Sequence, residues 1–463
     1  MKKLSLIFSL FFFCINLSFS QKAEWWLTTP DKSLLLAKQA SLSFSTVNSS
    51  DTSNVINIDP ACTYQSVDGF GFALTGGSAQ HISAMSADAR EKLLHELFGH
   101  GKNDIGISYL RVSIGSSDLN DHTFSYDDLP DGETDTGLKK FSLAEDEKNV
   151  IPVLKEILSI NPQIKILGSP WSAPLWMKTN DNIQGGMLRK EYYPVYAQYF
   201  VRYIQGMKKE GIPIDAITVQ NEPFNDGNTP SMQFLAKQEL DFIKKYLGPA
   251  FEKNAITTKI ILYDHNCDAP EYPISILEDT AARKYIDGSG FHLYAGSITA
   301  LTKVHNAFPE KNLYFTEMMT VNLHGDFNIA SPVSRIVIGA TRNWSRNVIL
   351  WNLAADVDFE PHTDNGGCAF CQGAVTLTKD VVERNIAYYT IAHVSKFVPA
   401  GSLRIKSSTD GALDNVAFKT PGNKTVLIIS NNRSASQKPS IVYNGKEIQP
   451  VLPPGSVATF VWN

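Results

Sequence analysis

The stretch Ala216-Ile-Thr-Val-Gln-Asn-Glu-Pro223 is a short β-prone run that ends in a cluster of polar residues. It is one of eight similar runs between about Gln65 and Val394, each paired with a stretch that has helical spacing of apolar residues. Strands that alternate with amphipathic helices predict parallel strands joined by helical crossovers. Eight such pairs predict an α/β fold of the (β/α)8, or TIM-barrel, type. The expected strands are 67–74, 107–115, 165–169, 216–220, 259–263, 290–294, 313–316 and 348–352.

Several of the expected helices carry boundary signals. Residues 142–145, Ser-Leu-Ala-Glu, have the pattern of a capping box ahead of an apolar series with helical spacing. The segments 203–210 and 242–247 are each followed by a glycine, Gly211 and Gly248. We expect both helices to end there, because glycine commonly terminates a helix.

The two ends of the chain have a different pattern. Residues 397–463 contain short alternating strands such as 425–429, separated by Pro-Gly and Asn-Gly pairs that are typical of turns. Residues 22–64 contain two more candidate strands. We therefore expect a side β-sandwich at 397–463 to which the 22–64 segment contributes strands, and a barrel at 65–396. A sandwich built from both chain ends would leave no long strand edge unpaired.

Residues 1–20 have the pattern of a secretory signal peptide: Lys2 and Lys3, then an apolar run, then Ser18-Phe-Ser20. The alternative is a membrane anchor, but the run is shorter than the ~20 residues that a span needs. Without this segment the chain has 40 basic and 47 acidic residues, a balance that does not favour binding to nucleic acid or to an anionic membrane. We expect a secreted or periplasmic protein with no integral membrane span.

Four cysteines follow the expected signal peptide: Cys62, Cys267, Cys368 and Cys371. An exported protein can form disulfides, and four cysteines allow three pairings. The Cys-x-x-Cys spacing at the last two is a weak zinc signal, because a second pair at similar spacing is absent. We favour a local disulfide between Cys368 and Cys371.

Two of the expected strands end in a glutamate. Glu222 follows the fourth strand and Glu317 follows the seventh. Active sites of such barrels lie where the strands end, so these two carboxylates are expected to face each other across the barrel mouth. Such a pair can supply the acid and the nucleophile of a retaining glycosidase, typically ~5–5.5 Å apart. The alternative is a pair of structural salt bridges at the rim.

Neighbouring residues suggest a role for each glutamate. Asn221 can hydrogen-bond a sugar hydroxyl while Glu222 protonates the leaving oxygen, so we assign Glu222 as general acid and base and expect a raised pKa. Glu317 is then the nucleophile. Arg111, at the end of the second expected strand, is a cation suited to keeping Glu317 ionised.

Further residues at the strand ends suit a sugar ring. Asp118 can accept two sugar hydroxyls, although it is also one acid of an acidic loop. Trp171 and Trp351 follow strands three and eight, where their faces can stack on a sugar, and core packing is the alternative for both. His292 and Tyr294 end the sixth strand. Trp176 fits the core equally well, and Asp264-His-Asn266 is a further candidate subsite.

The motifs resemble, in order, those of glycoside hydrolase family 30, the glucosylceramidase family. The matching segments are Gln65–Thr75, Gly106–Asp118, Ser169–Thr179, Thr218–Pro223, the segment around Glu317, and Trp351–Ala354. The resemblance implies a barrel with a side β-sandwich, retention of configuration, and neither metal nor cofactor. It also implies Glu222 as acid/base and Glu317 as nucleophile, with a sugar subsite lined by Arg111, Asp118, Trp171, Asn221, Tyr294 and Trp351.

Departures from the lysosomal members concern the substrate. Gly76-Gly77 replaces an acid in the first-strand motif, and Met318-Met319 follows the expected nucleophile. The segment 366–371 is similar to that of bacterial members, which include endo-β-1,6-glucanases and glucosylceramidases. We expect a β-1,6-glucan or a related β-glucoside as substrate. The alternatives are glucosylceramide and a non-catalytic glycan-binding role. A metal-dependent amidohydrolase is a further alternative. Such a barrel needs a His-x-His motif at the end of strand one, which the sequence lacks.

Overall fold

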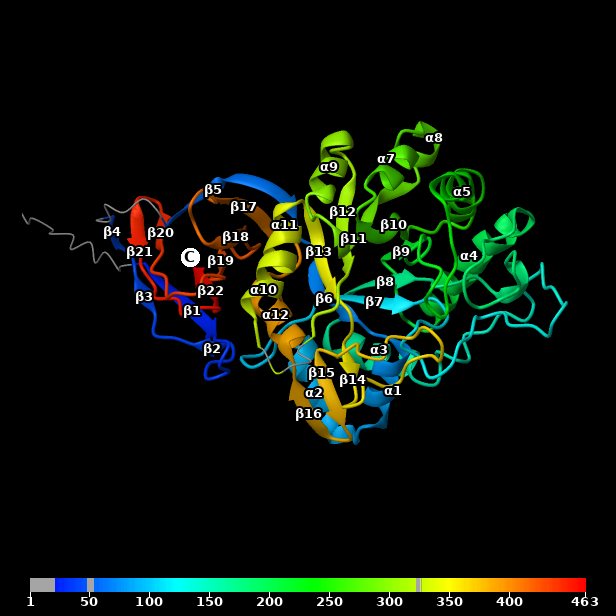
Figure 1. Ribbon diagram of the computed structural model, residues 1–463, viewed down its shortest axis with the longest axis horizontal. Coiled ribbons are helices and arrows are strands. Elements are labelled where there is room, and N and C mark those ends of the chain that lie inside the picture. Colours follow the sequence, from blue (N-terminus) through cyan, green and yellow to red (C-terminus); the bar gives the residue numbers. More distant parts are fainter. Residues whose placement is uncertain (1–20, 48–53, 322–324, 326) are drawn as a thin grey trace, which may run out of the picture.

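The computed structural model describes residues 21–47, 54–321, 325 and 327–463. The expected signal peptide at 1–20 therefore lies outside the described residues. Figure 1 shows two parts along the long axis of the molecule: a β-rich part, on the left, that contains strands from both ends of the chain, and a larger part in which helices surround strands.

The larger part is a closed barrel of eight parallel strands, as predicted. Each expected strand is present, and the eighth strand pairs with the first, Val348 opposite Phe70, which closes the barrel. Four strands are longer than predicted, the fifth to the eighth, and the fifth and sixth extend the most. The strands are β6 (Gly69–Ala73), β7 (Tyr109–Ser113), β8 (Lys165–Ser169), β9 (Ala216–Thr218), β10 (Lys259–Cys267), β11 (Ile286–Gly296), β12 (Asn312–Glu317) and β13 (Ser345–Leu350).

Packing on both faces of the strands explains their apolar sequences, since parallel strands covered by helices are buried on both sides. Inside the barrel, one cluster joins side chains from six strands: Tyr109, Leu167, Ala216, Ile261, Tyr314 and Ile349. A much larger cluster fills the space between the strands and the surrounding helices. The barrel interior is therefore a packed core, and only the strand ends are open to a ligand.

The helices of the barrel follow the strands in the expected order. They are α1 (Gly76–Ala84), α2 (Ala87–Phe98), α3 (Val150–Ile160), α4 (Tyr193–Lys209), α5 (Ala236–Phe242), α6 (Gly248–Lys253), α7 (Glu271–Leu277), α8 (Thr280–Arg283), α9 (Ala300–Ala307), α10 (Ala330–Pro332), α11 (Gly339–Arg342) and α12 (Ile386–Ser395). Short 3-10 or π turns adjoin several of them, at Lys190–Tyr192, Ile243–Leu247 and Val333–Ile338, and another 3-10 turn follows β8 at Leu175–Met177.

Two predicted helix boundaries were wrong. The segment 142–145 does not begin a helix, and helix α3 begins only at Val150, after an Asn149 whose side chain makes no capping hydrogen bond. The helix expected to end at Gly248 continues through a π turn into α6. Gly248 has a right-handed φ of −58°, and a β-carbon there would lie 2.3 Å from the Tyr285 ring. This glycine is required by close packing and does not terminate the helix.

The β-rich part is an eleven-stranded sheet that contains strands from both chain ends, with the C-terminal strands β22, β19, β18 and β17 between the N-terminal strands β1 and β5. The N-terminal segment contributes five strands, more than the two expected: β1 (Lys22–Thr28), β2 (Ala37–Lys38), β3 (Leu42–Ser43), β4 (Ser45–Thr46) and β5 (Val55–Ser66). The C-terminal strands are β17 (Leu403–Ser407), β18 (Asp414–Lys419), β19 (Thr425–Ser430), β20 (Ser440–Tyr443), β21 (Lys446–Ile448) and β22 (Val457–Trp462). A small separate sheet, β14 (Ala354–Ala355), β15 (Val375–Thr378) and β16 (Val381–Arg384), lies beside the barrel.

A hydrophobic core of its own holds the β-rich part together. It combines residues of both chain ends, for example Trp25, which stacks on Phe460 with ring centroids 5.3 Å apart. Strand β1 pairs with β22 over five residue pairs. The strands at the ends of the sheet order are only two residues long, which limits the unpaired edge. In the described part of the chain, no helix has the length and apolar character needed to cross a bilayer.

His393 of α12 joins the barrel to both chain ends. Its two ring nitrogens contact Thr459 Oγ1 at 2.9 Å and Thr28 Oγ1 at 2.8 Å. The ring is fully buried, and burial lowers its pKa to about 3. A histidine that is neutral in the fold but protonates in the unfolded chain stabilises the fold above its ordinary pKa and loses this contribution as the pH falls from about 6.5 towards 3.

We therefore predict that the protein loses stability on mild acidification partly through His393. Between pH 7 and pH 5 the His393 contribution should fall by roughly 2 kcal/mol. Thermal melts at both pH values would measure this loss, which should be smaller in a His393→Gln variant than in the wild type. Substitution of His122, an exposed histidine, is the matched control and should leave the acid loss unchanged. An equal loss in wild type and His393→Gln would contradict the prediction.

Candidate active site

A pocket of about 480 Å³ opens at the carboxyl ends of the barrel strands. Most of the predicted site residues line it: Asp118, Trp171, Asn221, Glu222, Tyr294, Glu317 and Trp351. Arg111 and His292 are fully buried directly beneath them. The structure thus brings all nine predicted residues together, from six different strands or the loops that follow them. Trp176, for which core packing was the alternative, is absent from the pocket lining and donates its indole N–H to the Asp127 carbonyl.

Backbone contacts fix both glutamates at the pocket floor. Glu317 is the last residue of β12. Glu222 follows β9, and its N–H donates to the Asp264 carbonyl at 3.0 Å. Glu222 has a φ of +47°, a conformation that is uncommon for residues other than glycine and costs of order 1–3 kcal/mol. Such strain at a pocket residue points to a functional constraint.

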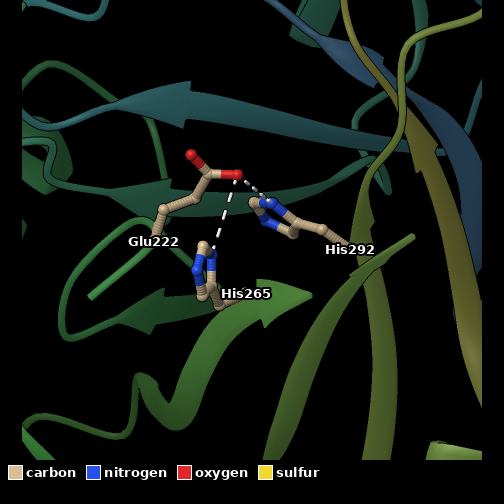
Figure 2. Close-up of side chains that lie close together, drawn as sticks. All are labelled: Glu222, His265 and His292. Atoms are coloured by element: carbon tan, nitrogen blue, oxygen red, sulfur yellow. Dashed lines mark hydrogen bonds and ion pairs between the residues drawn. The ribbon is translucent and has the colours of Figure 1, made fainter. Parts of the chain in front are cut away.

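One histidine contacts both carboxylates. Nδ1 of His292 lies 3.1 Å from Oε1 of Glu222 and 3.7 Å from Oε1 of Glu317. Figure 2 shows the His265 and His292 rings directed at the same Glu222 oxygen, with the other oxygen turned away from both. That second oxygen accepts a hydrogen bond of 2.7 Å from Nδ2 of Asn225. The two glutamates therefore converge on one point above His292.

Arg111 carries the compensating charge. Its guanidinium donates to Glu317 at 2.6 Å, to Asp264 at 2.8 Å and to Asn221 at 2.6 Å. Removing one partner of such a buried network leaves an uncompensated charge, which typically costs ~3–5 kcal/mol. The Arg111 guanidinium also lies 4.7 Å from the Trp171 ring. Arg111 thus contacts a carboxylate, an amide and an aromatic face of the pocket at once.

Asp264 is the central acceptor beneath the pocket, a role that the sequence did not reveal. It lies within β10, which continues past the predicted end at residue 263 and contains a register shift between Tyr263 and His265. The carboxylate is fully buried and accepts hydrogen bonds from Arg111, Thr218, Thr316, Ser169 and His292. Burial alone would raise its pKa, but the Arg111 charge and the His292 hydrogen bond lower it well below the ordinary value.

The charges around the two glutamates differ from the expectation. Burial would raise the pKa of Glu222, but the His265 and His292 rings outweigh it and lower this pKa, whereas we expected a raised one. Burial raises the pKa of Glu317 despite the His292 and Arg111 charges. Burial would lower the pKa of His292, but the charge of Glu317 and hydrogen bonds to Asp264 and Glu222 raise it to about 10. The expected raised pKa at Glu222 was therefore wrong, because sequence spacing did not reveal its two imidazole neighbours.

Glu222, His265 and His292 lie close enough together to hold a metal ion by position alone. His292, however, is flanked by a carboxylate at each ring nitrogen, at 3.1 Å in both cases. With its raised pKa it is an imidazolium that donates both N–H groups at neutral pH, and an imidazolium has no lone pair for a metal. The chemistry of this donor set fits an ion-pair network better than a metal centre.

Two tryptophans form an aromatic wall of the pocket. The rings of Trp171 and Trp351 are buried, with centroids 5.4 Å apart. Cys371 packs in the same cluster, and its disulfide to Cys368 confirms the predicted local pairing. Cys62 and Cys267, by contrast, are free. The disulfide is part of the pocket wall.

Several pocket residues were not predicted. They are Phe224, Asn225, Asn228, His265, Asn266, Met319, Cys368, Phe370 and Cys371. Of these, only the segment containing His265 and Asn266 was noted as a candidate subsite. Phe224 and Asn225 follow Glu222 directly in sequence, so proximity to the glutamate was a usable signal. Phe370 carried no such signal, since its loop is placed by the tertiary fold.

Asp118 allows a prediction about stability and activity together. The residue is only 6% exposed, and burial together with the Glu317 and Glu222 charges raises its pKa to about 8. A raised carboxyl pKa means that the fold is destabilised progressively as the pH rises from about 4 to about 8. Asp118→Asn should remove this loss and raise the melting temperature at pH 8, corresponding to about 1–3 kcal/mol.

The same Asp118→Asn variant should lose activity. If Asp118 binds a sugar hydroxyl as predicted, its largely protonated carboxyl makes a neutral hydrogen bond that contributes about 0.5–1.5 kcal/mol, so kcat/KM on a β-glucoside should fall roughly 2- to 13-fold. Melting curves at pH 5 and 8, together with steady-state kinetics, measure both effects. A variant with lower stability at pH 8 than the wild type would contradict the assigned charge state.

An eight-stranded barrel with two converging glutamates in a pocket lined by aromatic and polar side chains is the arrangement of a glycoside hydrolase. The family models agree with this class. Residues 67–398 match the glycosyl hydrolase family 30 TIM-barrel domain, and residues 401–460 match the glycosyl hydrolase family 30 β-sandwich domain. The chain therefore belongs to glycoside hydrolase family 30 and is a glycoside hydrolase.

Relatives with two different names are similar to the chain. The endo-1,6-β-D-glucanase BGN16.3 of Trichoderma harzianum is 34% identical over 86% of this chain and 84% of its own length. The lysosomal acid glucosylceramidase of Mus musculus is 28% identical over 90% of this chain and 84% of its own length. Among solved structures, the endo-β1,6-glucanase BT3312 superposes with a TM-score of 0.88 and 33% identity, over 95% of this chain and 99% of that one.

Proposed function

We propose that this protein is a retaining β-glycosidase that cleaves β-1,6-linked glucan in two steps through a glucosyl ester. The observation that carries the proposal is the pair Glu222 and Glu317, both in contact with the same nitrogen of His292. The two contacts limit the separation of the carboxylate oxygens to a value compatible with the ~5–5.5 Å of retaining enzymes and below most of the ~6.5–9.5 Å range of inverting ones.

Glu317 is the proposed nucleophile. One oxygen accepts from Arg111 and the other from the Tyr294 hydroxyl at 3.1 Å. These donors orient the carboxylate towards the anomeric carbon. In the first step a Glu317 oxygen forms a bond to that carbon, the glycosidic C–O bond breaks, and the leaving oxygen takes a proton from Glu222. In the second step Glu222 takes a proton from water, whose oxygen displaces Glu317.

The remaining predicted site residues hold the sugar. Trp171 and Trp351 supply apolar faces, and Asp118 accepts hydroxyl hydrogen bonds. Asn221, whose Oδ1 accepts from Arg111, has an amide N–H2 that can donate to the hydroxyl next to the anomeric carbon. His292 acts on Glu222 and Glu317 through its contacts with both carboxylates and positions them.

The pKa directions predict the pH dependence. The reactive form needs a proton on Glu222, whose pKa is lowered, and none on Glu317, whose pKa is raised. Only a minor fraction of the enzyme holds this arrangement, and the two apparent pKa values of a bell-shaped profile belong to the coupled pair. When the ester forms, Glu317 loses its negative charge, which favours the deprotonated form of Glu222. Deprotonated Glu222 can then act as the base in the second step.

We predict that His292→Gln shifts the profile of kcat/KM to higher pH. The imidazolium stabilises both carboxylates in their charged form, so its removal raises both pKa values, and both limbs of the bell move in the alkaline direction. Measurement of kcat/KM from pH 4 to pH 9 tests this. A profile that loses height without shifting would contradict the assigned charge of His292. His305, outside the pocket lining, provides a matched control substitution.

Similarity to three fungal endo-1,6-β-glucanases at 34% identity and to a solved endo-β1,6-glucanase at 33% supports β-1,6-glucan as the substrate. Identity to the glucosylceramidases is lower, at 27–29%. Glucosylceramide is the second candidate, because these relatives cover a similar share of the chain. The predicted signal segment at 1–20 supports export to the periplasm or the medium.

Digestion of a panel of substrates tests the proposal. We expect release of short oligosaccharides from a β-1,6-glucan, little action on β-1,3- and β-1,4-glucans, and no turnover of glucosylceramide. Product lengths read by chromatography distinguish internal cleavage from release of glucose alone. The anomeric configuration of the first product, followed by NMR, should be β. Turnover of glucosylceramide alone, or a first product of α configuration, would contradict the proposal.

A further inference from the structure

Three aromatic side chains are exposed in the described part of the chain, and all three line the same pocket. Phe224 is 43%, Tyr294 42% and Phe370 50% exposed. Exposed aromatic rings beside a pocket commonly mark a binding surface. Tyr294 is explained by its hydrogen bond to Glu317. The two phenylalanines have no polar group and no place in the mechanism described above.

The Phe224 ring is held in position. It packs edge-to-face against His265, with centroids 5.9 Å apart, and against Tyr272, with centroids 5.4 Å apart. The peptide on either side of it is also fixed: Asn225 N–H donates to the Glu222 carbonyl at 2.8 Å, and Phe234 N–H donates to the Pro223 carbonyl at 3.0 Å. A ring that is rigid before binding loses little entropy when a ligand stacks on it.

The position of Phe224 relative to Glu222 indicates which sugar it meets. Phe224 follows β9 and rests on residues of β10 and α7, whereas Trp171 and Trp351 follow β8 and β13. If Trp171, Trp351 and Asp118 hold the sugar that becomes attached to Glu317, the bond to be cut lies at Glu222. The unit beyond that bond then extends along the Glu222–Asn225 segment, where Asn225 and Asn228 add amide groups to the lining.

We infer that Phe224 is the stacking platform for the leaving-group sugar, the glucosyl unit on the far side of the bond that is cut, and that Asn225 and Asn228 bind the hydroxyls of this unit. This inference rests on the proposed function. By this inference Phe224 contributes to the selection of the leaving group. It does not contribute to binding of the transferred sugar.

Two substrates with the same transferred part and different leaving groups test the inference. Gentiotetraose, a β-1,6-linked tetrasaccharide, has a sugar as leaving group, whereas β-gentiobiosyl fluoride releases only fluoride. Phe224→Ala should reduce kcat/KM about tenfold on gentiotetraose, a change of ~1.4 kcal/mol that lies near the upper end of what an aromatic contact contributes. On the fluoride it should change kcat/KM by less than about twofold. Phe224→Tyr should retain wild-type kcat/KM on both substrates.

Val451→Ala truncates an exposed apolar side chain outside the pocket and is the control, with melting temperatures compared throughout. Equal losses on both substrates, or no loss on either, would overturn the inference. So would a selective loss in Phe370→Ala that is absent in Phe224→Ala, because the leaving group would then contact Phe370 and not Phe224. Inactivity of the wild type on both substrates would instead contradict the proposed function itself.

Discussion

Replacement of Glu317 by alanine is expected to reduce kcat on a β-glucoside by roughly 10⁴- to 10⁶-fold, because loss of a nucleophile that acts together with its neighbours removes the covalent route altogether. The protein should still fold. Burial raises the Glu317 pKa, which means that the ionised side chain destabilises the fold and its removal relieves this effect. Arg111 keeps its hydrogen bonds to Asp264 and Asn221 in the variant. Steady-state kinetics with a dinitrophenyl β-glucoside and a melting curve measure both effects.

Azide distinguishes the loss of a nucleophile from a general disruption. A small anion can enter the space left by the side chain and attack the anomeric carbon from the same face as Glu317, with departure of the dinitrophenolate. The expected product of Glu317→Ala is therefore the α-glucosyl azide, with inverted configuration. Glu310→Ala, which removes an exposed glutamate, is the control and should keep full activity. Retained activity in Glu317→Ala would exclude Glu317 as nucleophile.

Replacement of Glu222 by alanine is expected to give a different signature. On β-1,6-glucan, whose leaving group needs a proton, kcat should fall about 10²- to 10⁴-fold. With a dinitrophenyl glucoside the first step needs no proton and should proceed, while the second step is slow without a base. The glucosyl-enzyme then accumulates, so that KM falls together with kcat, and a burst of dinitrophenolate precedes the steady state.

Azide should restore turnover in Glu222→Ala by attacking the accumulated glucosyl ester, and the product should be the β-glucosyl azide. Asn225→Ala is the matched control: it removes the 2.7 Å hydrogen bond to Glu222 while leaving the carboxyl in place, and it should slow the glucan reaction without any azide rescue. A β-azide from the Glu317 variant and an α-azide from the Glu222 variant would reverse the two assigned roles.

Much of the fold could be predicted from the sequence, because strands buried on both faces must be continuous apolar runs. All eight barrel strands carried this local signal, and the turn pairs of 397–463 gave the all-β character of the C-terminal part. Helix boundaries were less predictable. Gly248 has the same local signal as a terminating glycine, but the contact with Tyr285 that requires it lies 37 residues further along the chain.

In the candidate site, too, some features could be predicted from the sequence and others could not. Glu222, Glu317 and Asn221 could be predicted because each stands at or just after a strand end, and barrel closure brings all strand ends to one rim. Arg111 was also predicted, although it lies in the middle of β7. The charge state of the glutamates could not be predicted. It depends on which strand neighbours which, since β10 and β11 bring His265 and His292 to Glu222.

The sequence by itself determined the barrel, the family and the pair of glutamates, because these depend on periodicity and on the position of a residue within its own strand. Only the tertiary structure decided that Asp264 is the common acceptor beneath the pocket, that the Glu222 pKa is lowered, and that Phe224 and Phe370 border the same opening. Hydrogen bonds, burial and ring contacts join residues far apart in the chain, and their energies depend on distances that are fixed only when the barrel closes.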